Sequence, residues 1–320
     1  MSTYGDTLPS AVRPGEQPPG YDEAEAIDAI PLRHWGRWIS AAILIFLVAA
    51  LLWSLYRNPR VDISTIGHNL FASYVLHGVV VTIELTIIAM IIGISGGVLL
   101  AVMRLSDNPV LKAVAWAYIW FFRGTPILVQ ILFWGFFGAL YPTLFLGIPF
   151  TGIVFGHAAT GRLYGAFVAA ILALGLNEAA YAAELVRAGI ISVDKGQYEA
   201  AHSLGMSGGQ TMRLVVLPQA MRVIIPPMGN ETISMLKTTA LVSVISGRDL
   251  LTVIQQAYAQ SFQIIPLLLV ASIWYLFLTS IMSVGQYYLE RHFGRGFGQK
   301  EAESAEKRAQ RRELRREPAR

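Results

Sequence analysis

The sequence predicts an all-α polytopic membrane protein with six membrane-spanning helices. Of its 320 residues, 54% are hydrophobic and only 14% are charged, whereas a soluble domain typically carries about 25% charged residues. The apolar residues come in runs of roughly twenty that are separated by short polar loops, which is the pattern of helices that cross a bilayer. The chain has no cysteine, which excludes disulfides, thiolate metal sites and cysteine nucleophiles.

The N-terminal part of the chain contains a polar leader and the first apolar run. Residues 1–34 are rich in proline, glycine and acidic residues and offer little apolar surface, so we expect a disordered leader there. The run from Trp38 to Tyr56 is long enough to span a bilayer and lies within a helix expected at residues 35–58. Two arginines precede this run and tryptophans lie near its ends, as is typical of residues that anchor a helix at the membrane interface.

Five further spans are expected between residues 72 and 292. The third span of the six contains Arg-Gly-Thr-Pro, starting at Arg123, which should kink it, and an uncharged loop follows at residues 141–161. Pro226 and Pro227 should kink or restart the fifth span, because proline lacks the amide donor and clashes with the preceding turn. The five spans are expected at residues 74–103, 114–140, 163–182, 220–245 and 265–288.

The positive charges of the loops predict the orientation, because short loops rich in lysine and arginine stay in the cytoplasm. These residues concentrate in the N-terminal segment, the loop after the second span, the polar segment between the fourth and fifth spans, and the C-terminal tail. Ten of the 25 lysines and arginines lie between Arg291 and Arg320. Both termini are therefore expected in the cytoplasm, with residues 293–320 as a basic tail that is either solvated or in contact with anionic lipid.

Several ionisable side chains lie within the apolar spans. Placing a charged side chain in the bilayer costs free energy, so such residues usually face a bundle interior or an aqueous cavity. Glu184 and Arg187 are one helical turn apart and are expected to form an ion pair near the cytoplasmic interface. Arg123 is interpreted as an interfacial residue whose guanidinium reaches toward the headgroups. For the remaining polar residues, a buried contact between helices competes with a place along a translocation route. These candidates are Glu84, Glu178, Asn230, Glu231 and Lys237.

The sequence contains no pattern typical of an enzyme. The six histidines are scattered, without metal-ligand spacing to one another or to a carboxylate. A phosphate-binding loop of the G-x-x-x-x-G-K type is missing, and the glycines of "GISGG" in the second span are better explained as small residues that let helices pack closely. No cofactor is expected, and uphill transport by this chain would depend on an ion gradient or on a partner's nucleotide.

The polar segment between the fourth and fifth spans carries the most specific motif. In this segment Glu199-Ala200-Ala201 is followed after three residues by Gly205, after nine more by Val215, and then by Leu217-Pro218. This spacing resembles the EAA signature of ATP-binding-cassette importer permeases, which commonly have isoleucine where this chain has Val215. A short helix at about residues 197–204 should end at Gly205, because glycine readily takes the left-handed conformation that ends helices. The alanines of the motif should give a low-relief face that a partner protein can approach closely. The motif consists of Glu199, Ala200, Ala201, Gly205, Val215, Leu217 and Pro218.

The resemblance extends over about residues 76–293 and is most specific to the polar amino acid subfamily of these permeases. The segments that carry it include "FFRGTPILVQ", "AAYAAELVRAGI" and "LPQAMRVIIPPMGNETISMLKTTALVSVIS", in the order of the subfamily. The resemblance implies a five-helix type I importer core at residues 72–292, to which the helix at 35–58 is an addition. Members commonly have Lys-Asp-Thr-Ser where this chain reads Lys-Thr-Thr-Ala from Lys237.

The resemblance also implies partners in a bacterial plasma membrane. Two permease subunits, identical or related, would form the pathway, a dimer of separate ATPase subunits would bind beneath, and an extracytoplasmic solute-binding protein would deliver an amino acid. Glutamine, glutamate, arginine, histidine and cystine all stay open as cargo. An ion-coupled carrier and a membrane anchor that recruits a cytoplasmic protein are the alternatives. The residues assigned to the ATPase contact are Glu199, Ala200, Ala201, Gly205, Leu217 and Pro218.

Overall fold

The computed structural model describes residues 35–148 and 154–293 and divides the chain into two units, residues 1–58 and 59–320. The expected leader at 1–34 and nearly all of the expected basic tail lie outside the described residues. In the first unit, helix α1 (Trp35–Arg57) coincides with the first predicted span, and all of its side chains are exposed. The guanidinium of Arg57 lies 4.9 Å from the ring centre of Trp53 at the end of this helix.

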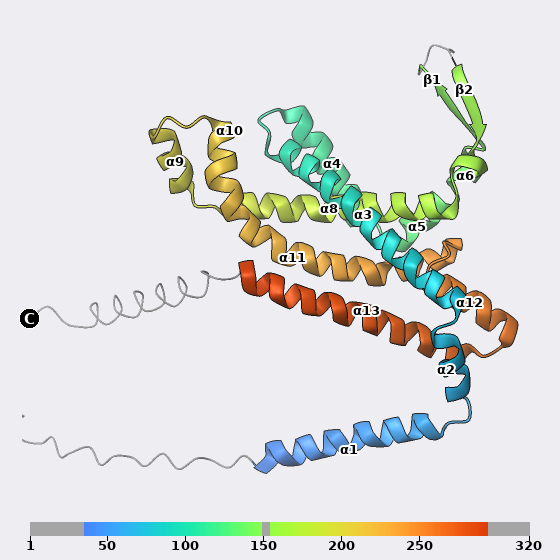
Figure 1. Cartoon of the computed structure of the whole chain (residues 1–320). Coiled ribbons are helices and arrows are strands. Elements are labelled where there is room, and N and C mark those ends of the chain that lie inside the picture. The colour runs from blue at the N-terminus through green and yellow to red at the C-terminus, as the bar shows by residue number, and fades with distance from the viewer. Residues whose placement is uncertain (1–34, 149–153, 294–320) are drawn as a thin grey trace, which may run out of the picture. The chain divides into compact units, whose positions relative to one another are not determined.

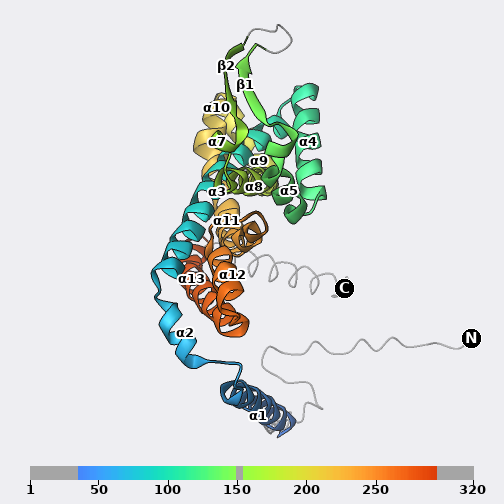
Figure 2. The same ribbon diagram turned by 90° about the vertical axis from the view of Figure 1, so that its right-hand side faces the viewer.

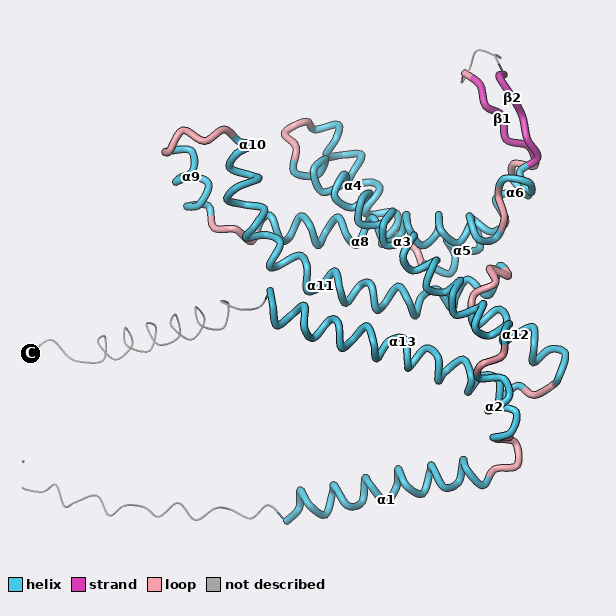
Figure 3. The backbone as a smooth tube through the Cα atoms, in the orientation of Figure 1, coloured by secondary structure: helices cyan, strands magenta, loops and turns pink. Residues whose placement is uncertain are grey.

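The second unit is built almost entirely of helices (Figures 1 and 3). Its two longest helices, α3 and α13, lie near its two ends in sequence, and α8 lies between them in sequence. The helices of at least eight residues are α2 (Ile63–Leu70), α3 (Ser73–Leu105), α4 (Pro109–Gly124), α5 (Ile127–Gly135), α8 (Ala166–Ile191), α9 (Lys195–Ser203), α11 (Leu217–Thr238), α12 (Leu250–Ser261) and α13 (Ile264–Phe293). The shorter elements are α6 (Phe137–Leu140), α7 (Thr160–Leu163), α10 (Gly208–Thr211), a π-helical turn (Met212–Val216) and a 3₁₀ helix (Thr239–Ile245).

Helices α3 and α8 pack against each other and run in the same direction (Figure 1). Their backbones approach closely because α3 presents glycines to α8. A side chain at Gly97 would place its Cβ 2.5 Å from the Cβ of Ala182, and one at Gly93 would collide with Glu178. The prediction that the glycines of the second span serve close helix packing is confirmed. Apolar side chains from α3, α5, α8 and α11 form the core around this contact.

The third predicted span, residues 114–140, is not one straight helix. It consists of α4 and α5, which meet at an angle of 99°, followed by α6. Thr125 has an extended backbone (φ −111°, ψ 141°) because it precedes Pro126, and Pro126 itself lacks the amide that would continue the helix of α4. The Arg-Gly-Thr-Pro sequence therefore produces a break that is much sharper than the expected kink.

A network of amide side chains satisfies the backbone at this break. Gln130, which is buried, donates to the carbonyls of Phe122 (2.9 Å) and Thr125 (3.1 Å) and to the hydroxyl of Thr125 (2.7 Å). From α8, the Asn177 amide donates to the same Phe122 carbonyl at 3.0 Å and to Oε1 of Gln130 at 3.2 Å. The network thus attaches the broken helix to the centre of α8.

We expect a Gln130→Leu substitution to lower the free energy of unfolding by about 1–3 kcal/mol, because the Thr125 carbonyl loses its side-chain donor and the Asn177 amide loses an acceptor while the side-chain volume changes little. Thermal unfolding of the detergent-solubilised protein measures the effect. Gln256→Leu, the same change at an exposed position of α12, is the control and should leave the melting temperature nearly unchanged. Equal melting temperatures for the two variants would contradict a structural role for the Gln130 network.

Helix α11 continues through Pro226 and Pro227 as one helix, so the predicted restart at these residues is wrong, while the alternative of a kink stays a prediction. The helix is held by its neighbours α8 and α13. On the α13 side, Gln286 donates to the Pro226 carbonyl at 2.8 Å and packs so closely on Gly229 that a Cβ there would collide with it. Contacts with neighbouring helices of this kind are one reason that prolines are tolerated inside membrane helices.

The described residues do not reproduce the count of six spans. Four helices are long and apolar enough to cross a bilayer, namely α1, α3, α8 and α13, and the bent pair α4–α5 would make a fifth. The fifth predicted span, at residues 220–245, corresponds to α11 and the 3₁₀ helix that follows it. Helix α11 is less apolar than the others, since it carries Arg222, Glu231 and Lys237.

The uncharged segment at residues 141–161, predicted to be a loop, contains an antiparallel hairpin. Strand β1 (Thr143–Gly147) pairs with β2 (Val154–Ala159), with Thr143 opposite Ala159 and a shift in register next to Gly147. The hydroxyl of Thr160 donates to the Tyr141 carbonyl at the base of the hairpin. The all-α prediction therefore holds for the spans but not for this connection.

Candidate functional site

The segment with the EAA spacing forms a short helix with a defined end. Helix α9 begins after Asp194, whose carboxylate accepts from the amide of Gly196 at 2.7 Å, and it ends at Ser203. Gly205 has a φ of +74° and donates to the His202 carbonyl at 2.9 Å, while the amide of Met206 donates to the Ala201 carbonyl at 3.1 Å. These two bonds form a Schellman motif, which closes a helix through a left-handed glycine. Helix α9 thus lies at Lys195–Ser203, where a short helix was expected at about residues 197–204, and Gly205 closes it.

One face of α9 is packed against the protein and the other is free. Ala201 is buried, and the Tyr198 ring packs against the apolar cluster formed by the ends of α3 and α8 and the start of α11. Glu199 and Ala200 are exposed, and Leu204 is 82% exposed. The two alanines of the motif therefore do not share one face, because only Ala200 is available to a partner while Ala201 anchors the helix. Leu204 is an exposed apolar residue that the motif analysis did not single out.

The other motif residues lie at the start of α11, beside α9. Leu217 and Pro218 are exposed, and they directly follow the π-helical turn that joins α10 to α11. Gln219 donates to the side chain of Gln197 in α9 at 3.2 Å. Helix α9 is thus connected to α11 by a side-chain contact as well as by the chain.

The α9 segment and the β-hairpin lie at opposite ends of α8 (Figure 1). The hairpin precedes α8 and α9 follows it, so the whole helix separates them. With 26 residues, α8 is about 39 Å long, which exceeds the roughly 30 Å of a bilayer's hydrocarbon core. A bilayer around α8 would therefore leave α9 and the hairpin on different sides.

A polar cavity of about 590 Å³ lies at the middle of α8, where α8, α11 and the α4–α5 break meet. Glu178 is the thirteenth of the 26 residues of α8 and is only 4% exposed. The guanidinium of Arg123 lies 5.1 Å from the ring centre of Tyr181. The polar and charged residues that line this charged cavity are Arg123, Thr125, Asn177, Glu178, Tyr181, Glu231, Ser234 and Thr238.

Two of the five translocation-path candidates, Glu178 and Glu231, line the charged cavity together. The other three lie elsewhere: Glu84 and Lys237 are exposed, and Asn230 donates to Glu290 of α13 at 3.5 Å. Arg123 belongs to the cavity although its sequence position pointed to the membrane interface. The signal for its role was the Thr-Pro pair that follows it, because the resulting break turns the end of α4 toward α8.

The ion pair predicted within α8 is confirmed. The Arg187 guanidinium donates twice to one carboxylate oxygen of Glu184, at 2.6 and 3.0 Å. Both side chains are partly exposed, at 34% and 23%. This pair lies near the end of α8 that leads into α9 and not in the charged cavity.

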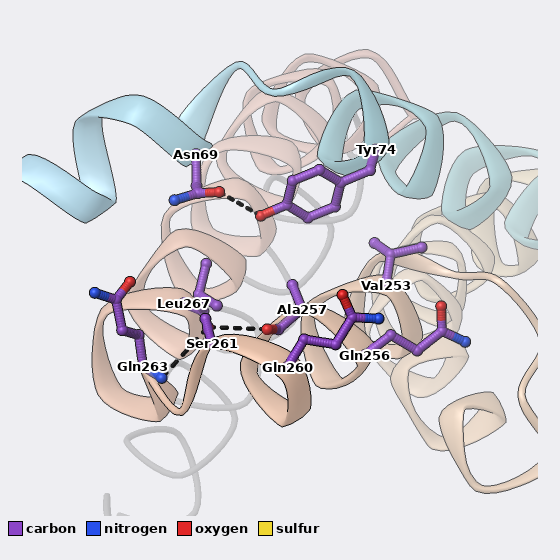
Figure 4. Close-up of a pocket in the computed structure, with 9 residues that line it drawn as sticks. All are labelled: Asn69, Tyr74, Val253, Gln256, Ala257, Gln260, Ser261, Gln263 and Leu267. Carbon is purple, nitrogen blue, oxygen red and sulfur yellow. Dashed lines mark hydrogen bonds between the residues drawn. The ribbon is translucent and has the colours of Figure 1, made fainter.

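A second cavity, of about 480 Å³, lies between the start of α3 and the helices α12 and α13. Figure 4 shows the Tyr74 hydroxyl donating to Asn69, with the amide side chains of Gln256 and Gln260 extending from α12. The residues that line it carry no formal charge: Asn69, Tyr74, Val253, Gln256, Ala257, Gln260, Ser261, Gln263 and Leu267. An uncharged, amide-lined cavity offers no counter-ion to a charged solute, which distinguishes it from the charged cavity.

Comparison with known proteins identifies the family. Residues 93–295 match the family described as binding-protein-dependent transport system inner membrane component. The chain is 48% identical to the arginine transport system permease protein ArgU of Corynebacterium glutamicum over 288 residues, covering 88% of each chain. It is 33% identical to the nopaline transport system permease protein NocM of Agrobacterium fabrum, covering 72% of this chain and 94% of that protein.

The fold also resembles a solved structure. A crystal structure of an amino acid ABC transporter with histidines matches with a TM-score of 0.58 and 36% sequence identity, covering 68% of this chain and 94% of that one. The match to the family extends over more than half of the chain and includes α8, α9 and α11. The chain therefore belongs to the family of inner membrane components of binding-protein-dependent transport systems.

Proposed function

We propose that this chain is the permease subunit of an ATP-binding-cassette importer that moves polar amino acids across the bacterial plasma membrane. The observation that carries this proposal is the pairing of a rigidly closed, half-exposed α9 with a charged cavity at the centre of α8. The relatives named for arginine and nopaline, and the solved amino acid transporter, support the substrate class.

In the proposed mechanism, α9 receives the movement of a separate ATPase dimer. Glu199, Ala200 and Leu204 form the exposed face that meets the ATPase, while the buried Ala201 and Tyr198 hold the helix to the ends of α3, α8 and α11. A displacement of α9 is then transmitted to α8 and α11, which carry Glu178 and Glu231. The nucleotide states of the ATPase thereby select between arrangements of the cavity through their different contacts with α9.

The remaining parts of the proposal concern sidedness and partners. The α9 side of α8 is cytoplasmic and carries both termini, and the hairpin side faces an extracytoplasmic solute-binding protein. A second permease subunit, identical or related, completes the pathway. The arginine and lysine of the predicted cytoplasmic loops support this orientation, and so does the length of α8 between α9 and the hairpin.

Reconstitution tests the function. Proteoliposomes that contain the permease, its ATPase and the external binding protein should accumulate a radiolabelled amino acid only when ATP is enclosed with the ATPase. Uptake that persists in vesicles without any ATPase subunit would instead support an ion-coupled carrier. Association with the ATPase without uptake of any amino acid would support the role of a membrane anchor.

A further inference from the structure

The β1–β2 hairpin carries an inference about the surface that it contacts. We propose that this hairpin lies in the headgroup layer of the bilayer at the N-terminal end of α8, with one face turned toward the lipid chains. The inference requires only that α8 crosses the bilayer, so it does not depend on which solute the protein moves or on what drives the movement.

The first argument is that the hairpin lacks a cover of its own. Two paired strands are at most marginally stable in water unless a helix or a further strand packs on them. This hairpin is attached at its base, where the Thr160 amide donates to the Pro142 carbonyl at 2.9 Å and α7 follows β2. Further out, Phe145 and Phe155 are 68% and 70% exposed. The described part of the chain therefore leaves this region for another surface to cover.

The second argument is the chemistry of one face of the hairpin. Phe145 of β1 pairs with His157 of β2, and the centres of their rings lie 6.3 Å apart. Because side chains alternate between the two faces of a strand, Phe155 lies on the same face as His157. This aromatic face, formed by Phe145, Phe155 and His157, combines apolar rings with the polar tip of a histidine. Such a combination suits the boundary between the acyl chains and the headgroups.

The third argument is the absence of charge. Residues 141–161 contain no aspartate, glutamate, lysine or arginine. Soluble proteins protect the open edges of a sheet with charged side chains, because an uncharged apolar edge in water pairs with other chains. Interfaces between proteins have a polar rim and about one hydrogen bond per 100–200 Å², whereas His157 is the polar member of the aromatic face. A lipid surface fits this composition better than water or a protein partner does.

The fourth argument is the depth and direction of the hairpin. Helix α8 is about 39 Å long, close to the roughly 40–45 Å of a bilayer with both of its headgroup layers. The N-terminal end of α8, to which α7 joins the hairpin, therefore lies at the level of the headgroups. Figures 1 and 2 show that the strands run across the direction of α8, which places them along the bilayer surface. The hydrocarbon core is excluded, because the open strand edges would lack hydrogen-bond partners there.

The fifth argument is that exposed apolar surface continues from the membrane helices into the hairpin. The bent pair α4–α5 is long and apolar enough to form one span. Exposed apolar side chains lead from α5 through α6 to β1, and no charged residue interrupts the segment: Phe133, Phe136, Leu140, Tyr141 and Phe145. The hairpin thus extends the surface that faces lipid.

The test measures the depth of the hairpin in a bilayer. The chain has no cysteine, so one introduced cysteine carries a nitroxide label at a single known site. The full-length permease with its ATPase is reconstituted into liposomes of phosphatidylcholine and phosphatidylglycerol. The collision rates of the label with oxygen, which concentrates among the acyl chains, and with a water-soluble nickel complex give its depth.

We expect the label in the Phe145→Cys and Phe155→Cys variants to lie about 5–10 Å below the phosphates. Leu276→Cys, at an exposed position of α13, should place the label deeper, and Asp107→Cys, in the exposed loop between α3 and α4, should place it in water. Collisions with nickel at both hairpin positions as frequent as at Asp107→Cys would overturn the inference. Shielding from both reagents would indicate a protein contact, such as a second copy of this chain, and would also overturn it.

Matched variants test whether the aromatic face holds the hairpin at this depth. In the Phe145→Cys background, Phe155→Ser should move the label toward water, because it removes the remaining phenylalanine of the aromatic face. Phe277→Ser is the same change at an exposed position of α13 and should leave the depth of the label unchanged. An unchanged depth in the Phe155→Ser variant would contradict the role of the aromatic face in the proposal.

Discussion

Replacing Gly205 with valine is expected to abolish most ATP-dependent uptake while leaving the amount of protein in the membrane unchanged. Gly205 has a φ of +74°, a conformation that costs an ordinary residue about 1–2 kcal/mol and more when the residue is β-branched. Nothing lies within 4 Å of the position of an added Cβ, so the effect is conformational and not a collision. Reconstituted uptake and ATPase activity should therefore become uncoupled, because the end of α9 no longer closes in its native form.

Gly208→Val is the control for this prediction. Gly208 lies three residues further along, also has no atom within 4 Å of an added Cβ, and does not have a positive φ. The Gly208→Val variant should retain most of the wild-type uptake, because the substitution affects only the first turn of α10. Wild-type uptake by the Gly205→Val variant would mean that the precise end of α9 is not needed for transport. This result would contradict the proposed role of α9.

The second large effect is expected at the contact between α3 and α8. A leucine at Gly97 would place its Cβ 2.5 Å from the Cβ of Ala182 and 2.9 Å from the backbone nitrogen of Ala183. Backbone atoms of a neighbouring helix cannot move aside as the end of a flexible side chain can, so the two helices must separate. Overpacking of this kind typically costs about 1–3 kcal/mol and occasionally more. We expect a lower melting temperature and less folded protein in detergent.

Gly285→Leu is the matched control for Gly97→Leu. Gly285 lies in α13, is exposed, and has no atom within 4 Å of an added Cβ. The same substitution there should leave the melting temperature close to that of the wild type. If both variants melted at the same temperature, the close contact between α3 and α8 would not be a major source of stability.

The EAA segment was predictable in detail because its signals are local. Gly205 ends a helix through its own backbone freedom, and the bonds that close α9 join residues at most five positions apart. The sequence did not show which residues of this segment face outward. Ala200 and Ala201 are the same residue type, and only the packing of α9 against the neighbouring helices buries Ala201 and leaves Ala200 exposed.

The charged cavity was predictable only in part. Glu178 and Glu231 could be selected because carboxylates are unusual in apolar helices, but the same reasoning selected Glu84 and Lys237, which lie outside the cavity. Arg123 was assigned to the membrane interface because the sequence around it is aromatic and apolar. Its place in the cavity follows from the 99° break after it, whose angle depends on the packing of α5 and on the Gln130 network.

The sequence by itself determined the membrane class, the positions of the long apolar helices, the short helix that ends at Gly205 and the ion pair between Glu184 and Arg187, because composition, hydropathy and short-range geometry govern these features. The tertiary structure alone decided that α11 continues as one helix through Pro226 and Pro227 and that Arg123, Glu178 and Glu231 share one cavity. The physical reason is that these side chains come from α4, α8 and α11, which are far apart in the sequence. The composition of each helix does not show which neighbour it packs against, so only the packing of the helices shows which polar side chains meet.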